Sequence, residues 1–429
     1  MAPQTHRCES IAFQNKKDYN DKKKCFREDG MEEKTEQPLI LLNGVLEDAA
    51  AADFARAMRE DDPVRYARAY AALLETDMQR NFAEYIARAV LYDDNLFARR
   101  AFAGKAEGDV REAYLHDLSA LQALTERTDD LPPRIAEAVR AGLPRIGRGQ
   151  APFGENWASG QTAEMLAQFY RANGYGMFID HKAFTYEGGK LVPVRNAPDI
   201  TLDQLKDYEA EKRAVEDNVI NFVRGLPYSN MLLYGDKGTG KSSTVHAMLN
   251  KYAPAGLRAA ELTKDKVGEI NEIKGVLAAL PFKFLLFIDD LSLEERDEKV
   301  TALKAGLEGS MHEKSDNVMI VATSNRRHIL KENFSDRENS VHARDTMEEQ
   351  LSLSDRFGLT VCFSSTGKKE YLSIVRQLAA DGKITLPDEE LCALAERWAL
   401  VKGGRSPRRA RQFVDYLVAC QAKGSEILI

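Results

Sequence analysis

One short motif constrains this chain more than any other feature of its sequence. Residues 235–242 are Gly-Asp-Lys-Gly-Thr-Gly-Lys-Ser; they follow the apolar run 231–234 and precede the amphipathic segment 243–251. Between a strand and a helix, such a glycine-rich loop lets backbone N–H groups converge on phosphate oxygens. Lys241 would then reach the β- and γ-phosphates of a nucleotide, and Ser242 would ligate Mg²⁺. The alternative, a glycine-rich turn that binds nothing, is disfavoured by this setting. The predicted phosphate-binding residues are Gly235, Asp236, Lys237, Gly238, Thr239, Gly240, Lys241, Ser242 and Ser243.

Length and composition limit the classes of protein to consider. A chain of 429 residues exceeds what one hydrophobic core usually serves, so we expect two or three domains. The net charge of −7 creates no overall basic field, so nucleic acid is a possible partner but not a favoured one. The most apolar stretch, residues 282–288, is far shorter than the roughly 20 residues of a membrane-spanning helix. We expect no membrane association and, without an apolar secretory signal, a cytoplasmic protein.

The cysteines give no sign of a disulfide framework or a zinc site. The chain has 5 of them, an odd number, and no two are spaced as Cys-x-x-Cys. Cys362 lies in an apolar run, which predicts a small buried hydrophobic side chain.

The first half of the chain divides into three predicted parts. Residues 1–37 are polar, with little apolar periodicity, and are predicted to be a disordered tail within which Met31 is a second candidate start. Residues 38–175 show helical periodicity, as in the face formed by Phe82, Tyr85, Ile86, Ala89 and Val90, and are predicted to be a helical domain. Residues 176–199 are predicted to be a β-hairpin and linker, because a Gly-Gly pair separates two alternating apolar runs.

The second half alternates strands and helices, which is typical of a parallel sheet covered by helices. Thr201 is a predicted N-cap, and residues 202–223 are predicted to be one long amphipathic helix before the phosphate-loop strand. Residues 200–364 form the predicted α/β core, and residues 365–429 form a smaller helical part.

An acidic pair follows the next buried strand. The apolar residues 284–288 end at Asp289 and Asp290, and a central parallel strand delivers its last residues to the ligand edge of the sheet. Asp289 is predicted to hold Mg²⁺ through water, and Asp290 to orient or deprotonate an attacking water. The alternative is an acidic strand end in a solvated loop. The phosphate loop earlier in the chain favours the functional interpretation.

A third strand, residues 317–325, ends in Thr-Ser-Asn. The amide of Asn325 is predicted to lie between the phosphate loop and the acidic strand and to position the attacking water. Alternatively, Asn325 caps a turn. Its place after the acidic strand favours the first interpretation.

Two arginine features come later in the chain. Arg356 precedes the short apolar strand 359–363, and the helix that opens near residue 405 carries Arg405, Arg408, Arg409 and Arg411. Phosphoryl transfer needs positive charge on the γ-phosphate in the transition state, which an arginine commonly provides. A solvated face or a basic nucleic-acid patch is the alternative for the later group.

This order of motifs resembles that of the AAA+ ATPases. Within them, the chain is similar to a bacterial family known mainly as a domain of unknown function with predicted ATP binding. The resemblance is strongest over residues 200–420. The segments that carry it are residues 232–243, 323–329, 351–358 and 410–415.

The resemblance implies a fold class and a set of roles. The fold is an α/β P-loop NTPase core with a C-terminal helical lid, preceded by a mostly α-helical N-terminal domain. The cofactors are ATP and Mg²⁺, and the activity is ATP hydrolysis. The implied roles are Walker A for Lys241 and Ser242, Walker B for Asp289 and Asp290, sensor 1 for Asn325, a finger acting on the nucleotide of a neighbouring subunit for Arg356, and sensor 2 for Arg408. A finger of this kind implies a homo-oligomer.

One departure from the family pattern leaves two functions open. Vigorous AAA+ hydrolases usually have Glu where this chain has Asp290. The first hypothesis is an ATPase that couples hydrolysis to conformational change on an unknown protein client, engaged by the N-terminal helical domain. The alternative is a low-turnover, ATP-dependent switch or loader that holds a protein or nucleic-acid partner. A P-loop kinase is disfavoured, because it explains neither the Thr-Ser-Asn strand nor the late arginine helix.

Overall fold

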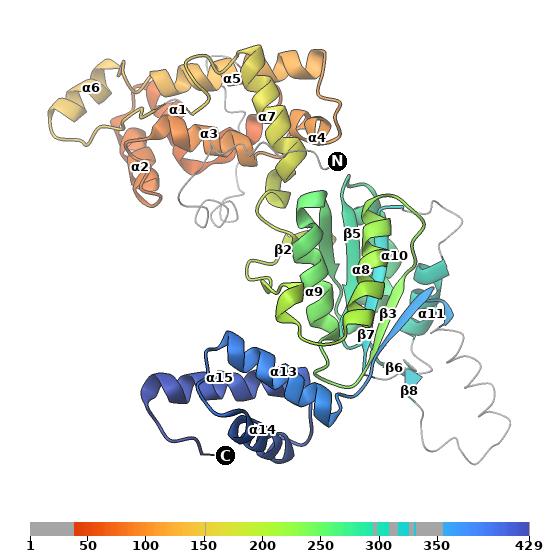
Figure 1. Cartoon of the computed structure of the whole chain (residues 1–429). Helices are drawn as coiled ribbons and strands as arrows, with labels where there is room; N and C mark the ends of the chain where they lie inside the picture. The colour runs from red at the N-terminus through yellow and green to blue at the C-terminus, as the bar shows by residue number, and fades with distance from the viewer. Residues whose placement is uncertain are drawn as a thin grey trace. The chain divides into compact units, whose positions relative to one another are not determined.

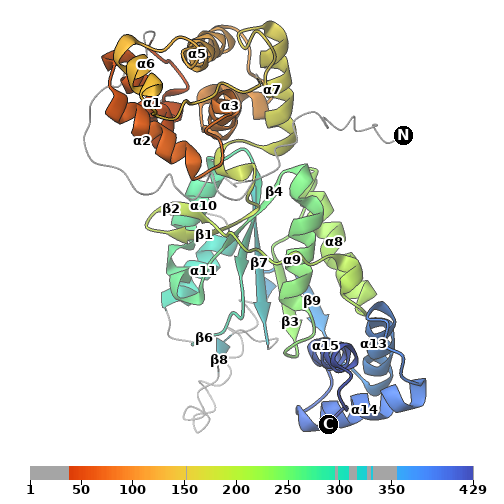
Figure 2. The ribbon, with the colours of Figure 1, turned by 90° about the vertical axis from the view of Figure 1, so that its left-hand side faces the viewer.

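A computed structural model describes residues 38–150, 152–294, 298–308, 316–325, 330–331 and 355–428. The predicted tail, residues 1–37, lies outside these ranges. The chain divides into two compact units, Met1–Asp180 and His181–Ile429 (Figures 1 and 2). Across the described residues, no helix is both long enough and apolar enough to cross a membrane.

The first unit is helical, as its periodicity predicts. On α3 (Phe82–Tyr92), the predicted apolar face of Phe82, Tyr85, Ile86, Ala89 and Val90 is buried. Phe82 packs against Phe54 of α1 with the ring centroids 4.3 Å apart. The other elements are η1 (Asn43–Glu47), α1 (Ala49–Glu60), α2 (Pro63–Leu74), α4 (Leu96–Phe102), α5 (Asp109–Glu126), α6 (Pro133–Arg140), α7 (Gly160–Asn173) and η2 (Gly176–Phe178).

The second unit is built on a seven-stranded sheet in the order β2-β1-β4-β5-β7-β3-β9. All neighbouring pairs are parallel except β1 with β2. The strand with the Thr-Ser-Asn end, β7, lies between the phosphate-loop strand β3 and the acidic strand β5, as the sequence predicts. The strand bounds are β1 (Ala183–Glu187), β2 (Lys190–Pro193), β3 (Met231–Gly235), β4 (Leu257–Glu261), β5 (Lys283–Ile288), β7 (Val318–Ser324) and β9 (Leu359–Phe363); β6 (Leu293–Glu294) and β8 (Leu330–Lys331) pair separately.

Helices cover both faces of this sheet (Figure 2). One face carries α8 (Glu209–Val223) and α9 (Lys241–Tyr252), and the other carries α10 (Ile270–Ala278) and α11 (Glu298–Glu308). The central strands are buried along nearly their whole length, which explains why they are continuous apolar runs and not alternating ones. The predicted α/β fold class is confirmed.

The hairpin is confirmed, but its role as a linker is wrong. Gly188 and Gly189 have φ of 55° and 79° and join β1 to antiparallel β2; positive φ at both central residues is what a tight type I′ turn requires. Strand β1 also pairs in parallel with β4, with Ala183 opposite Ala259. The hairpin is therefore part of the sheet of the second unit, and the unit begins at His181, not near residue 200.

The single long helix predicted over residues 202–223 is wrong. A short turn, η3 (Leu202–Gln204), is separated from α8 by residues 205–208. Asp207 and Tyr208 have φ of 71° and 62°, which a right-handed helix excludes. Thr201 is the N-cap of η3, and its N–H donates to Gln204 Oε1 at 3.3 Å.

The chain ends in three helices with an apolar cluster of their own: α13 (Lys368–Asp381), α14 (Asp388–Val401) and α15 (Pro407–Lys423). Tyr371, Phe413 and Leu417 are buried in this cluster. Ser406 caps α15, since its Oγ accepts from the N–H of Arg409 at 3.3 Å, and Pro407 occupies the first helical position.

Cys362 is exposed, so the prediction that it is buried is wrong. Along strand β9 the burial alternates, so one of its faces is covered and the other is exposed. Val361 and Phe363 point into the core, and period-two alternation places Cys362 on the other face.

Candidate functional site

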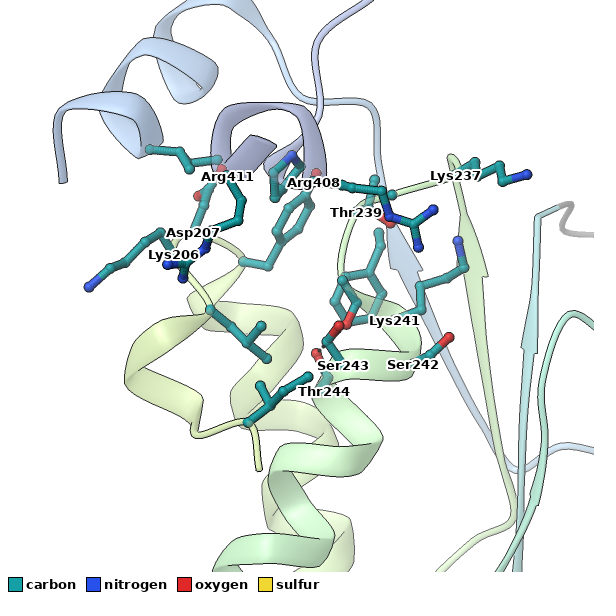
Figure 3. Close-up of a pocket in the computed structure, with 18 of the residues that line it drawn as sticks. Lys206, Asp207, Lys237, Thr239, Lys241, Ser242, Ser243, Thr244, Arg408 and Arg411 are labelled. Atoms are coloured by element: carbon teal, nitrogen blue, oxygen red, sulfur yellow. Dashed lines mark hydrogen bonds between the residues drawn. The ribbon is translucent and has the colours of Figure 1, made fainter. Parts of the chain in front are cut away.

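The carboxyl ends of the central strands open onto a cavity of about 610 Å³ (Figure 3). Its lining comes from residues 237–244 of the phosphate loop and α9, from Asp289 and Asp290, and from Asn325. Further parts of the wall come from Thr323 and Phe363, from residues 204–208, and from α13 and α15. Ligands of parallel α/β sheets bind at this edge of the sheet.

Glycines allow the phosphate loop to turn tightly. Gly235 has φ of 132°, and a Cβ placed on it would lie 2.0 Å from the carbonyl oxygen of Phe363 in neighbouring β9. Only glycine fits there. Gly240, with φ of 99°, is the N-cap of α9, which starts at Lys241. The positive end of this helix therefore faces the cavity.

Lys241 is buried at the centre of the site. Its Nζ donates to the carbonyl oxygens of Gly235 and Asp236, both at 2.8 Å, and to Asn325 Oδ1 at 3.3 Å. Burial lowers the pKa of Lys241 from the ordinary lysine value, and the nearby carboxylates of Asp236, Asp289 and Asp290 oppose that shift. A buried ammonium group aimed at a cavity favours an anionic ligand.

The acidic pair is joined to the phosphate loop by hydrogen bonds. Ser242 Oγ donates to Asp289 Oδ1 at 2.6 Å. Asn325 Nδ2 donates to Asp290 Oδ1. Together with the bond from Lys241 to Asn325, these contacts bring Lys241, Ser242, Asp289, Asp290 and Asn325 together around one end of the cavity.

Sequence reasoning did not single out Thr323, which lies within the same network. Its Oγ1 donates to Asp289 Oδ1 at 2.6 Å and accepts from the N–H of Asp290 at 2.9 Å. The residue lies two positions before Asn325 in the Thr-Ser-Asn segment. The polar end of this strand, which indicated Asn325, therefore also contains Thr323.

The residues present fit a magnesium ion. Ser242 and Asp289 offer a hydroxyl and a carboxylate, the hard oxygen ligands that Mg²⁺ prefers. Among the described residues, no cluster of three or more His, Cys, Asp or Glu side chains is arranged to hold a metal on its own. This suits Mg²⁺, which usually takes one or two carboxylates and completes its shell with water and substrate phosphates.

Of the predicted arginines, some line the cavity and others do not. Arg408 and Arg411 line the cavity, whereas both sides of the Arg405 guanidinium pair with Glu396, at 2.9 and 2.7 Å. The N–H of Arg408 donates to the carbonyl of Gly238 at 3.2 Å, so the start of α15 contacts the phosphate loop. In Figure 3 the side chains of Arg408, Lys241 and Ser242 extend to the same side of the loop. Arg356 precedes β9 and is not among the residues that line the cavity.

The wall formed by residues 204–208 was missed entirely. Tyr208 lines the cavity, and its hydroxyl donates to the carbonyl of Ser364 at 2.7 Å. Its ring packs on Phe363 with a centroid distance of 5.3 Å. No motif marks this segment, because the apolar pattern continues through it as if the helix were unbroken. Further apolar lining comes from Ile200, Leu205, Ile374 and Leu378.

Comparison with known proteins finds one family and several partial similarities. The model of the family described as "Protein of unknown function (DUF815)" matches residues 179–421. The replication factor C large subunit of Nanoarchaeum equitans (strain Kin4-M) is 41% identical over 51 residues, and this match spans 12% of either chain.

Solved structures of RuvB from Thermotoga maritima are also similar. One RuvB variant aligns with a TM-score of 0.39 and 16% identity over 54% of this chain and 69% of its own. A structure titled a Holliday junction branch migration motor aligns with a TM-score of 0.38, the same identity and the same coverage of both chains.

Proposed function

The chain belongs to the family described as "Protein of unknown function (DUF815)", and from that premise we propose that it is an AAA+ ATPase that binds and hydrolyses ATP with Mg²⁺. One observation supports this most directly. The cavity gathers the phosphate loop, the Asp289–Asp290 pair and Asn325, although these come from three separate strands.

Each of these groups has a task in phosphoryl transfer. The ammonium group of Lys241 and the positive end of α9 bind the phosphates. Ser242 and Asp289 would hold Mg²⁺, which would supply positive charge to offset that of the phosphates. Asp290 orients or deprotonates the attacking water, and the bond from Asn325 holds its carboxylate in place.

The size and lining of the cavity suit a nucleoside triphosphate. Its volume of about 610 Å³ lies within the range of roughly 300–1,000 Å³ typical of small-molecule sites. The polar end holds the loop and the carboxylates. Leu205, Ile374 and Leu378 supply apolar surface for a base at the other end.

Two arginines support a role in assembly and movement. Arg408, on the C-terminal helices, would bind the phosphates and so link nucleotide occupancy to the position of those helices. Arg356 does not line the cavity of its own chain, and we propose that it acts on the nucleotide of a neighbouring subunit in a homo-oligomer. The N-terminal helical unit would engage an unknown protein client.

A low-turnover switch or loader is the second candidate, and one contact favours it. The carboxylate of Asp290 is one methylene shorter than the usual Glu and is bonded to Asn325. A carboxylate held in this way is a less effective base for water. A switch would bind ATP tightly, hold a protein or nucleic-acid partner and hydrolyse ATP very slowly.

Steady-state Mg-ATP hydrolysis across a range of protein concentrations tests the proposal, with Lys241→Ala as the blank. We expect specific activity to rise with concentration and to vanish in the blank. Arg356→Ala should lower kcat by about 10³-fold or more, the scale of arginine-finger losses. Tight ATP binding without turnover at any concentration would favour the switch instead.

A mixing experiment isolates the action between subunits. Lys241→Ala subunits keep Arg356, and Arg356→Ala subunits keep an intact nucleotide site. If the arginine acts on a neighbour, mixing the two inactive variants should restore part of the activity. Failure to restore activity in a mixed assembly of native size would contradict the proposed role of Arg356.

A further inference from the structure

Thr323 is a buried polar residue in β7, the strand that pairs with the acidic strand β5. It lies near the carboxyl end of β7 and is only 2% exposed. The parallel register places Ile288 opposite Ala322, so the next residues, Asp289 and Thr323, are neighbours across the two strands. A polar side chain in this place is buried and must find hydrogen-bond partners.

The hydroxyl of Thr323 bonds to both acidic residues at once. A hydroxyl has a single proton to donate, and this one goes to Asp289 Oδ1 at 2.6 Å. One of its lone pairs accepts the N–H of Asp290 at 2.9 Å. The main-chain carbonyl of Thr323 accepts from the N–H of Leu291 at 2.7 Å. One residue therefore fixes three consecutive residues of the acidic turn.

The backbone of that turn needs such support. Asp290 has φ of 51°, in the left-handed region that residues with a side chain seldom adopt. This conformation accompanies the bond between the Asp290 carboxylate and Asn325. The orientation of the Asp289 carboxylate is also fixed, because the hydroxyls of Ser242 and Thr323 both donate to the same oxygen, Oδ1.

We propose that Thr323 is a positioning residue that orients Asp289 towards Mg²⁺ and Asp290 towards the attacking water. The inference rests on the proposed ATPase function and adds to it a residue of the cavity lining that acts through its hydrogen bonds to Asp289 and Asp290. Hydrogen-bond partners of metal-binding side chains commonly change metal affinity or activity by about 10–100-fold when removed. A role limited to packing would depend on the methyl group of Thr323 and not on its oxygen.

The test compares Thr323→Ser with Thr323→Ala in the full chain, since these variants differ by one oxygen atom. Binding of a fluorescent, non-hydrolysable ATP analogue is measured with excess Mg²⁺ and again with EDTA. The ratio of the two Kd values reports the metal contribution alone. We expect the Ser variant to keep the native ratio and the Ala variant to lose about 10–100-fold of it, with Kd in EDTA unchanged. In hydrolysis, the Ala variant should have a higher KM for Mg-ATP, as its weaker binding with Mg²⁺ requires, and a lower kcat, because Asp290 no longer orients the water.

Two reference variants give the values expected for a full loss of the metal contribution and for no loss. Ser242→Ala removes a direct metal ligand and sets the scale of a full loss. Thr360→Ala makes the same substitution at an exposed position of β9 and should leave the ratio unchanged. If Thr323→Ala does not fold, Thr323→Val replaces it, because valine keeps the branched shape without the hydroxyl.

Three outcomes have distinct meanings. A native Kd ratio and native kcat in the variant that lacks the hydroxyl would overturn the inference. Equal losses in the Ser and Ala variants would also overturn it, because the methyl group and not the oxygen would then matter. A native chain that fails to bind the analogue under either condition would overturn the proposed function itself, and the inference with it.

Discussion

At the scale of single residues, Gly235 shows how closely the phosphate loop is packed against the sheet. Its φ of 132° is available to glycine and strained for other residues, and a Cβ would lie 2.0 Å from the carbonyl of Phe363. The backbone strain alone costs about 1–3 kcal/mol. The steric contact adds to this, because β3 and β9 would have to separate.

We therefore expect Gly235→Ala to lower the free energy of unfolding by more than about 3 kcal/mol. Gly256→Ala is the matched control: Gly256 also has a positive φ, of 89°, but a Cβ there meets no atom within 4 Å. That change should cost about 1–2 kcal/mol. Urea denaturation of the two variants measures both values. Equal losses would show that the contact with Phe363 contributes nothing.

At the scale of elements, the break between η3 and α8 joins two parts of the second unit. Tyr208 stands at the start of α8, where its hydroxyl bonds to the carbonyl of Ser364 at 2.7 Å and lies 3.0 Å from Thr366 Oγ1. Ser364 and Thr366 belong to the connection from β9 to α13. The wall of the cavity and the approach to the C-terminal helices are therefore held by one side chain.

Replacing Tyr208 with Phe removes these bonds and keeps the ring. We expect Tyr208→Phe to lower the free energy of unfolding by about 0.5–1.5 kcal/mol, the net value of a typical hydrogen bond. Tyr228→Phe is the control, because the Tyr228 hydroxyl reaches the carbonyl of Val318 only at 3.4 Å. Its loss should be smaller. Denaturant unfolding compares the two, and an equal loss would mean that the bonds of Tyr208 carry no special weight.

At the scale of the whole molecule, the boundary between the two units agrees with the extent of the family match. The second unit begins at His181, and the matched residues begin at 179. The sheet and the whole lining of the cavity belong to this unit. The edge of β4 is covered by the β1–β2 hairpin, which the predicted boundary near residue 200 would have cut away.

We predict that a chain of residues 181–429 folds and binds ATP with the affinity of the full-length protein. A shorter chain that starts at residue 195 lacks β1 and β2 and exposes the edge of β4, so it should be less stable and prone to aggregate. Thermal unfolding and equilibrium ATP binding on both truncated chains test this. Equal stability of the two would show that the hairpin is dispensable.

Features that neighbouring residues specify could be predicted from the amino-acid sequence. The phosphate loop, its strand and helix, the acidic strand end and the Gly-Gly hairpin all follow from local backbone preference and from the period of apolar residues. The parallel α/β class follows from the alternation of such segments. The roles of the predicted site residues stay predictions, although most of these residues line one cavity.

Features that depend on residues far apart in the chain became visible in the folded structure. The contacts of Thr323 and the pairing of β1 with β4 join segments that share no local pattern. The exposure of Cys362 depends on which face of its strand the rest of the unit covers. The helix break at Tyr208 also depends on a distant residue, Ser364. The spacing of apolar residues indicates which face of a helix is buried, but a long-range hydrogen bond can outweigh the helix preference of one residue.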